Sequence, residues 1–141
     1  MTTSAKMSVM ACVLCNPAGD LVYEDDDSYV VLHEDWAVAG HAMVVSKRHV
    51  ENASDLDEAA WLRLASVWHR AEAAVLELTG AERCIVMKLG IQTPHLHLHL
   101  YPVGKEATRT EVFAAIDGKT SVRRDETFIA GLRRHLTPEG R

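Results

Sequence analysis

The stretch PHLHLHLYP, residues 94–102, alternates histidine with leucine and decides how the rest of the chain is interpreted. Side chains of a β-strand alternate between the two faces of a sheet, so His95, His97 and His99 share one face. The leucines between them share the other face and point into a core. The pattern therefore predicts a half-buried strand that carries chemistry on its open side.

The length of this histidine row limits what it can bind. Residues two apart on a strand are about 6.6 Å apart, so the row from His95 to His99 spans about 13 Å. A zinc–nitrogen bond is about 2.0–2.1 Å long, so one ion can be shared by two neighbours but hardly by all three. A neutral imidazole is also a competent nucleophile toward phosphorus. We therefore expect one end of the row to be structural and the rest to be catalytic.

The flanking sequence predicts a small mixed fold. β-Branched and aromatic residues predict strands at 21–25, 28–34, 41–47 and 83–90, in addition to the strand at 95–102. Apolar residues three or four apart predict a long helix that begins at Ser54, with a capping box to Asp57, and ends at Gly80. Shorter helical patterns cover 110–116 and 123–136. These elements predict an α+β fold with a mainly antiparallel five-stranded sheet, one long helix and a helical C-terminal segment.

Composition bounds the organisation and the partners. The chain has 141 residues, of which 48% are hydrophobic, and a formal net charge of −5. We expect a flexible tail over 1–8 and one domain over 9–141, with a core at 11–103 and an extension at 104–141. No long basic run indicates nucleic-acid binding and no apolar run reaches the roughly 20 residues of a membrane span, whereas a small phosphate ligand remains compatible with the charge.

Cysteine usage indicates a reducing location. The chain has 3 cysteines and lacks a convincing export signal, which argues against a disulfide framework and favours the cytoplasm. Cys12 and Cys15 form a C-x-x-C pair, a spacing compatible with metal binding, redox chemistry or simple packing. Cys84 stands alone before an apolar run and is expected to be a small buried side chain.

Taken together, these motifs resemble those of the histidine triad (HIT) superfamily. HLHLHLY at 95–101 matches the alternating histidine signature of that superfamily, and residues 40–49 match its G-H-x-x-V-x-x-K-x-H pattern. The C-x-x-C pair precedes both motifs, and the resemblance extends over about residues 11–103. It implies a nucleotide hydrolase or nucleotidyl transferase that acts at the phosphate α to a nucleoside, and commonly a homodimer.

The resemblance also implies roles for individual residues. His97 would be the nucleophile that forms a covalent nucleotidyl intermediate, and His99 would bind phosphate oxygens and help the leaving group. Gln92 and Thr93 precede the triad, where the family often places polar donors. His41, in the G-H pair, is expected to be structural.

A structural zinc ion is implied as well. In some branches of the superfamily, the first triad histidine binds zinc together with a C-x-x-C pair and the histidine of the K-x-H segment. Here these residues are Cys12, Cys15, His49 and His95. Two thiolates and two imidazoles suit a closed tetrahedral site, which would leave His97 free for chemistry.

The sequence departs from the family in the expected nucleoside pocket. His33 stands where several members place an acidic or amide residue against the ribose, and Trp36 replaces a common proline. Two other functions therefore stay open. One is a non-catalytic nucleotide-binding or interaction protein, and the other is a hydrolase that uses the histidine row as catalytic metal ligands. The second needs an open coordination position and a nearby carboxylate, and 88–102 contains neither Asp nor Glu.

Overall fold

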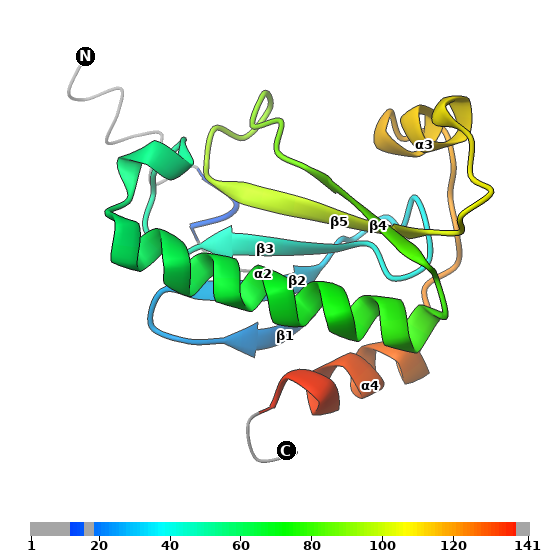
Figure 1. Cartoon of the computed structure of the whole chain (residues 1–141), viewed down its shortest axis with the longest axis horizontal. Helices are drawn as coiled ribbons and strands as arrows, with labels where there is room; N and C mark the ends of the chain where they lie inside the picture. The colour runs from blue at the N-terminus through cyan, green and yellow to red at the C-terminus, as the bar shows by residue number, and fades with distance from the viewer. Residues whose placement is uncertain (1–11, 16–18, 138–141) are drawn as a thin grey trace.

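The computed structural model describes residues 12–15 and 19–137, so the tail expected at 1–8 lies outside the described residues. Figure 1 shows one sheet with helix α2 lying across it and α4 beside α2. The elements, in chain order, are β1 (Leu21–Glu24), β2 (Ser28–Leu32), β3 (Ala42–Ser46), η1 (Ala53–Asp55), α2 (Glu58–Thr79), β4 (Arg83–Met87), β5 (His97–Val103), α3 (Arg109–Ile116) and α4 (Glu126–Leu136). None of the described helices is long and apolar enough to cross a membrane.

The sheet has five strands in the order β1-β2-β3-β5-β4, and all four strand pairs are antiparallel. This confirms the predicted α+β class. The histidine strand β5 is central, between β3 and β4, with His97 opposite Val45 and His99 opposite Met43. His95 precedes β5, although the Ser46 N–H still donates to Leu96 O there.

Helix α2 begins later than the sequence pattern predicts. Ser54 lies inside the short 3₁₀ turn η1, and Asp57 is the residue whose side chain caps α2 by accepting from the Ala60 N–H. The expectation of a helix start at Ser54 is therefore wrong by one turn, because serine and aspartate cap helices about equally well and the local sequence does not choose between them. Gly80 ends α2 in the left-handed conformation with φ 75°, as predicted.

The two faces of the sheet differ in what covers them. One face packs against α2 and α4 in the main core, to which Leu96, Leu98 and Leu100 all contribute. This confirms the prediction that the leucines of the alternating stretch point inward.

The opposite face carries the histidines between two small apolar clusters. One cluster joins Leu14, from the turn of Cys12, to Tyr29, Val31 and Val45. The other joins Ala115 of α3 to Ala37 and Tyr101. The N-terminal turn and α3 therefore cover the two ends of the histidine row and leave its middle open.

The loop before β3 is packed closely against the helices. Gly40 has φ +85°, and a Cβ atom at this position would lie 2.8 Å from Thr79 Cγ2 and 3.0 Å from Phe128 Cζ. Only glycine meets both the conformational and the steric demand. This packing fixes the position of His41, the next residue, on the histidine face of the sheet.

Candidate functional site

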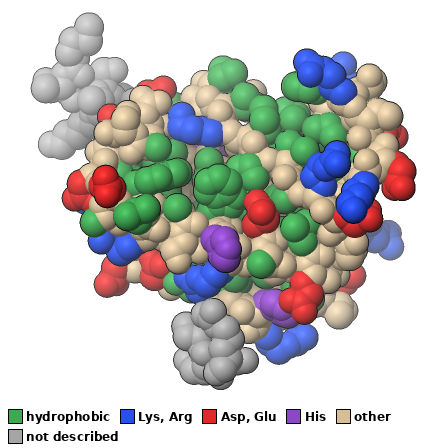
Figure 2. All heavy atoms as spheres, viewed as in Figure 1, with side chains coloured by type: hydrophobic (Ala, Val, Ile, Leu, Met, Phe, Trp, Pro, Cys, Tyr) green, Lys and Arg blue, Asp and Glu red, His purple; other side chains and the backbone are tan. Residues whose placement is uncertain are grey.

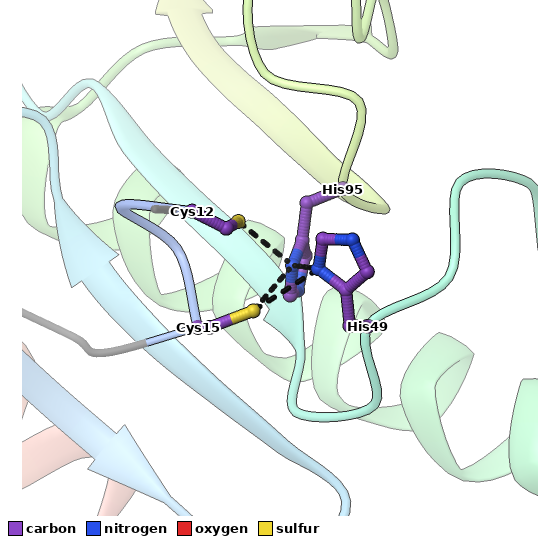
Figure 3. Close-up of side chains that lie close together, drawn as sticks. All are labelled: Cys12, Cys15, His49 and His95. Carbon is purple, nitrogen blue, oxygen red and sulfur yellow. Dashed lines mark hydrogen bonds between the residues drawn. The ribbon is translucent and has the colours of Figure 1, made fainter. Parts of the chain in front are cut away.

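Cys12, Cys15, His49 and His95 come together at one end of the row, as Figure 3 shows. Cys12 and Cys15 lie on a turn closed by the Cys15 N–H and Cys12 O, and the Tyr29 hydroxyl donates to Leu14 O to hold that turn on the sheet. The ligand atoms of the four side chains all lie within 4.8 Å of one another. Segments from three distant parts of the sequence thus converge on one point.

The distances in this cluster fit a tetrahedral ion. With bonds of about 2.0–2.1 Å to nitrogen and about 2.3 Å to sulfur, zinc holds two nitrogens about 3.4 Å apart and nitrogen and sulfur about 3.6 Å apart. The Nδ1 atoms of His49 and His95 are 3.2 Å apart. Cys15 Sγ lies 3.0 Å from His49 Nδ1, and Cys12 Sγ lies 3.3 Å from His95 Nδ1.

The proton positions in the cluster also favour a cation. His95 Nε2 lies 2.6 Å from the carbonyl oxygen of Ser46, so it donates its proton there and turns a bare Nδ1 toward the sulfurs. Burial, together with the neighbouring Cys12, raises the pKa of the Cys15 thiol to about 11. The Cys15 thiol therefore needs a nearby positive charge to become a thiolate ligand.

His97 is oriented by the backbone of His95. Its Nδ1 lies 2.5 Å from His95 O, and because a carbonyl only accepts, Nδ1 carries the proton. The lone pair of neutral His97 is therefore on Nε2, which makes no hydrogen bond to the described residues. His97 is buried but lines the pocket on the histidine face, so this nitrogen is the one available to a ligand.

His99 is held by His41. His41 Nε2 and His99 Nδ1 are 2.9 Å apart, and His41 Nδ1 is buried without a hydrogen-bond partner among the described residues. An unpaired buried N–H is costlier than an unpaired lone pair, so His41 donates from Nε2 and His99 keeps its proton on Nε2. Burial lowers the pKa of His41 to about 2 and that of His99 to about 4, which keeps both rings neutral at pH 7. His99 thus offers the pocket a hydrogen-bond donor.

His33 lies against this pair. Its ring stacks on that of His41 with centroids 4.4 Å apart and planes 5° apart, and its Nδ1 lies 2.8 Å from Asp35 O. His33, His41 and His99 also bring ligand nitrogens within 4.8 Å of one another. However, an imidazole binds a metal in its own plane, and two parallel planes share no point. Because His33 and His41 are stacked, these three histidines are poorly placed to share one ion.

The residues expected at the substrate site surround one pocket of about 810 Å³. The residues of this set that line it are His33, Gln92, Thr93, His97 and His99. Trp36 does not line this pocket, because its side chain is only 2% exposed and packs edge-on against Phe128 in the main core, with centroids 5.4 Å apart. It therefore lies beneath the pocket wall.

Sequence reasoning missed the far wall of this pocket. It consists of Ala115, Ile116, Asp117, Gly118, Thr120 and Ser121, at the end of α3 and in the segment after it. These residues form no motif and lie far from the triad in the sequence, so no local pattern could have identified them. Asp35 also lines the pocket, and nothing in the sequence marked it either.

Comparisons with known proteins agree with this geometry. The chain matches the HIT domain family over residues 16–106. The crystal structure of a zinc-bound histidine triad family protein from Mycobacterium smegmatis is similar, with a TM-score of 0.66 and 26% identity over 90% of this chain and 94% of that one.

Two further solved structures share the fold. A histidine triad protein from Bradyrhizobium japonicum has a TM-score of 0.69 and 24% identity, over 84% of this chain and 92% of that chain. A hypothetical histidine triad nucleotide-binding protein from Sulfolobus tokodaii has a TM-score of 0.66 and 21% identity, over 89% of each chain. Family match, sheet topology and histidine row agree, and the chain belongs to the HIT domain family.

Proposed function

We propose that the protein is a nucleotide hydrolase or nucleotidyl transferase that acts at the α-phosphate of a nucleoside phosphate compound. The observation that carries this proposal is the orientation of His97, whose Nδ1 is occupied by His95 O while Nε2 is free at a pocket. This is the arrangement that a histidine nucleophile needs, because the lone pair is fixed and faces the ligand.

The reaction would proceed in two displacements. The Nε2 lone pair of His97 attacks the α-phosphorus, and the bond from phosphorus to the leaving group breaks with its electron pair on that group, which takes up one proton from solvent. Water, or a second acceptor, then attacks phosphorus and releases one proton to solvent. The phosphorus–nitrogen bond breaks and His97 returns to its neutral form, so protons and electrons balance over the cycle.

The neighbouring side chains would bind and position the phosphate. The Nε2–H of His99, fixed by the hydrogen bond from His41, can donate to a phosphoryl oxygen as negative charge increases there. Gln92 and Thr93 offer further polar groups beside the phosphate, and His33 offers Nε2 to the rest of the substrate.

We propose that Cys12, Cys15, His49 and His95 hold a structural zinc ion. The nitrogen and sulfur spacings support this assignment, and so does the hydrogen bond from His95 to Ser46. Zinc bound there would cross-link the N-terminal turn, the segment after β3 and the start of β5. His97 would remain outside the ligand set.

We further propose a homodimer, located in the cytoplasm, where thiols such as Cys12 and Cys15 stay reduced. Strand β4 is at the edge of the sheet, so its outer backbone groups can pair with a second chain. Figure 2 shows hydrophobic side chains gathered over the N-terminal half of α2, where Leu62 is 57% exposed. Sedimentation of the wild type and of Leu62→Glu tests this, and a wild-type monomer contradicts it.

The experiment on function is trapping of the nucleotidyl-histidine. The protein is mixed rapidly with a labelled adenosine 5′-phosphate derivative, quenched in alkali, which preserves phosphorus–nitrogen bonds, and analysed by mass spectrometry. The adduct is expected on His97 in the wild type and in His69→Ala, which changes an exposed histidine of α2, and absent from His97→Ala. Tight nucleotide binding without adduct or turnover would instead assign the chain as a non-catalytic binding protein.

A further inference from the structure

The turn that carries Cys12 and Cys15 is part of both the proposed zinc site and the pocket. Figure 3 shows the two cysteine side chains pointing from this turn toward the two histidines of the zinc site. The residues between the cysteines, Val13 and Leu14, line the same pocket as His97. Whatever fixes the position of the turn therefore fixes a part of both sites.

Tyr29 holds this turn on the sheet. It lies on β2, its side chain is only 1% exposed, and its hydroxyl donates to Leu14 O at 2.5 Å. Within residues 12–15 and 19–137, no other hydrogen bond joins the backbone of the turn to the sheet. Loss of the Tyr29 hydroxyl would therefore leave Leu14 O without its partner from the sheet.

Apolar contacts add to this hydrogen bond. Leu14 is only 9% exposed and packs with Tyr29 and Val45 in one small cluster. Cys12 lies against the same cluster, and Val45 is opposite His97 on the neighbouring strand. The contacts of the turn thus extend from the cysteines to the neighbour of the proposed nucleophile, so a displaced turn would change the zinc site and the pocket together.

We propose that Tyr29 is a positioning residue whose hydroxyl holds the turn where both sulfur atoms reach the metal and where Val13 and Leu14 complete the pocket. Tyr29 neither lines the pocket nor belongs to the four proposed ligands, so it acts through the turn. Hydrogen bonds that orient metal ligands are typically worth about 10- to 100-fold in metal affinity. This inference rests on the proposed zinc site and, for its effect on the pocket, on the proposed function.

The experiment uses Tyr29→Phe, which removes one oxygen atom and keeps the packing of the ring. Zinc affinity, measured by competition with a chromogenic chelator, is expected to fall about tenfold or more. The visible absorption of the cobalt(II)-loaded protein, which reports tetrahedral coordination, is expected to change as well. Tyr23→Phe is the matched control, because the Tyr23 hydroxyl donates to the Asp25 carboxylate instead, and it should leave affinity and absorption unchanged.

Kinetics test the effect on the pocket. With an adenosine 5′-phosphoramidate as substrate, Tyr29→Phe is expected to raise KM about threefold and to keep kcat within about twofold of the wild type. The reason is that the wall of the pocket moves while His97 keeps its hydrogen bond to His95 O. An unchanged KM would contradict the inferred role of Tyr29 at the pocket.

A measurement without metal separates this inference from the proposed zinc site. The Cys15 N–H donates to Cys12 O within the turn, and in the metal-free protein its hydrogen exchange should be about tenfold faster in Tyr29→Phe than in the wild type. If the wild type binds neither zinc nor cobalt, the proposed zinc site fails, and this exchange rate still decides whether Tyr29 holds the turn.

Two results would overturn the inference. One is a zinc affinity of Tyr29→Phe within about twofold of the wild type, well below the effect expected of an orienting hydrogen bond. The other is an unchanged exchange rate at Cys15. Melting temperatures verify that the variants fold. Should Tyr29→Phe not fold, Leu14→Ala removes the apolar contacts of the same turn and is expected to lower the zinc affinity likewise.

Discussion

Two groups of histidines lie near the two ends of the same row and differ in what surrounds them. At one end, His49 and His95 meet two thiols, with their Nδ1 atoms 3.2 Å apart. At the other end, His41 and His99 share one hydrogen bond of 2.9 Å, and His33 stacks on His41 in a parallel plane. Identical side chains thus suit a metal ion in one place and a neutral hydrogen-bonded array in the other. The neighbours and the ring planes, rather than the residue type, make the difference.

The largest expected effect is at the cluster with the thiols. Cys12→Ala should lower the zinc content from about one per chain to near zero and the free energy of unfolding by about 3 kcal/mol or more, because metal binding is coupled to folding. Elemental analysis and denaturant titration measure both quantities. Cys84→Ala is the matched control, since Cys84 lies on β4 outside the cluster, and it should keep the zinc. A wild type purified without chelator and free of metal would refute the four-ligand assignment.

The next effect concerns the donor at the other end of the row. His99→Gln should lower kcat about 100-fold with little change in KM, because a preorganised donor to the charged transition state is weakened or displaced. Steady-state kinetics with an adenosine 5′-phosphoramidate measure both kcat and KM. His135→Gln is the control, because His135 pairs with Glu77 on the surface. Equal kcat values in His99→Gln and His135→Gln would show that His99 takes no part in the reaction.

The same residue should affect the pH dependence of stability. Burial lowers the pKa of His99 from 6.5 to about 4, so between these values the unfolded chain binds a proton that the folded protein does not. The free energy of unfolding should therefore fall as the pH falls through this window. In His99→Gln the slope should be smaller by up to one proton, as measured by denaturant titration at several pH values. Because both proteins contain the proposed zinc ligands, the subtraction cancels their contribution, and identical slopes would contradict the assignment of a neutral His99.

The smallest effect is expected at His33. Its ring is partly exposed and stacks on His41, so His33→Asn should raise KM about three- to fivefold and leave kcat nearly unchanged. Steady-state kinetics with the same adenosine 5′-phosphoramidate measure both values. A fall in kcat as large as that of His99→Gln would instead mean that the stacking of His33 on His41 contributes to the chemical step.

Several features of the fold could be predicted because their cause is local. Alternation fixed the faces of β5, and apolar spacing with Gly80 located the body and the end of α2. The start of α2 was wrong by one turn, since Ser54 and Asp57 are both good caps and only the packing of the helix decides between them. The four cysteine and histidine residues of the cluster could be listed from the family resemblance, but their convergence is a property of the fold.

The far wall of the pocket could not be predicted. Asp117, Thr120 and Ser121 carry no motif, and the hydrogen bonds that place their segment join it to residues more than 80 positions earlier. Trp36, noted in the sequence as a departure from the family in the expected nucleoside pocket, lies in the core, because a large indole gains more from burial against Phe128 than from exposure at the pocket.

The sequence by itself determined the strand that carries the histidines, the face on which they lie and a spacing along which one ion could hardly be shared by all three. These conclusions follow from the fixed rise and alternation of a β-strand. Only the tertiary structure decided that His49 and His95 converge on the thiols, which nitrogen of each ring carries the proton, and which distant segment closes the pocket. Hydrogen bonds and ring orientations depend on neighbours in space, and the spacing of residues along the chain does not reveal those neighbours.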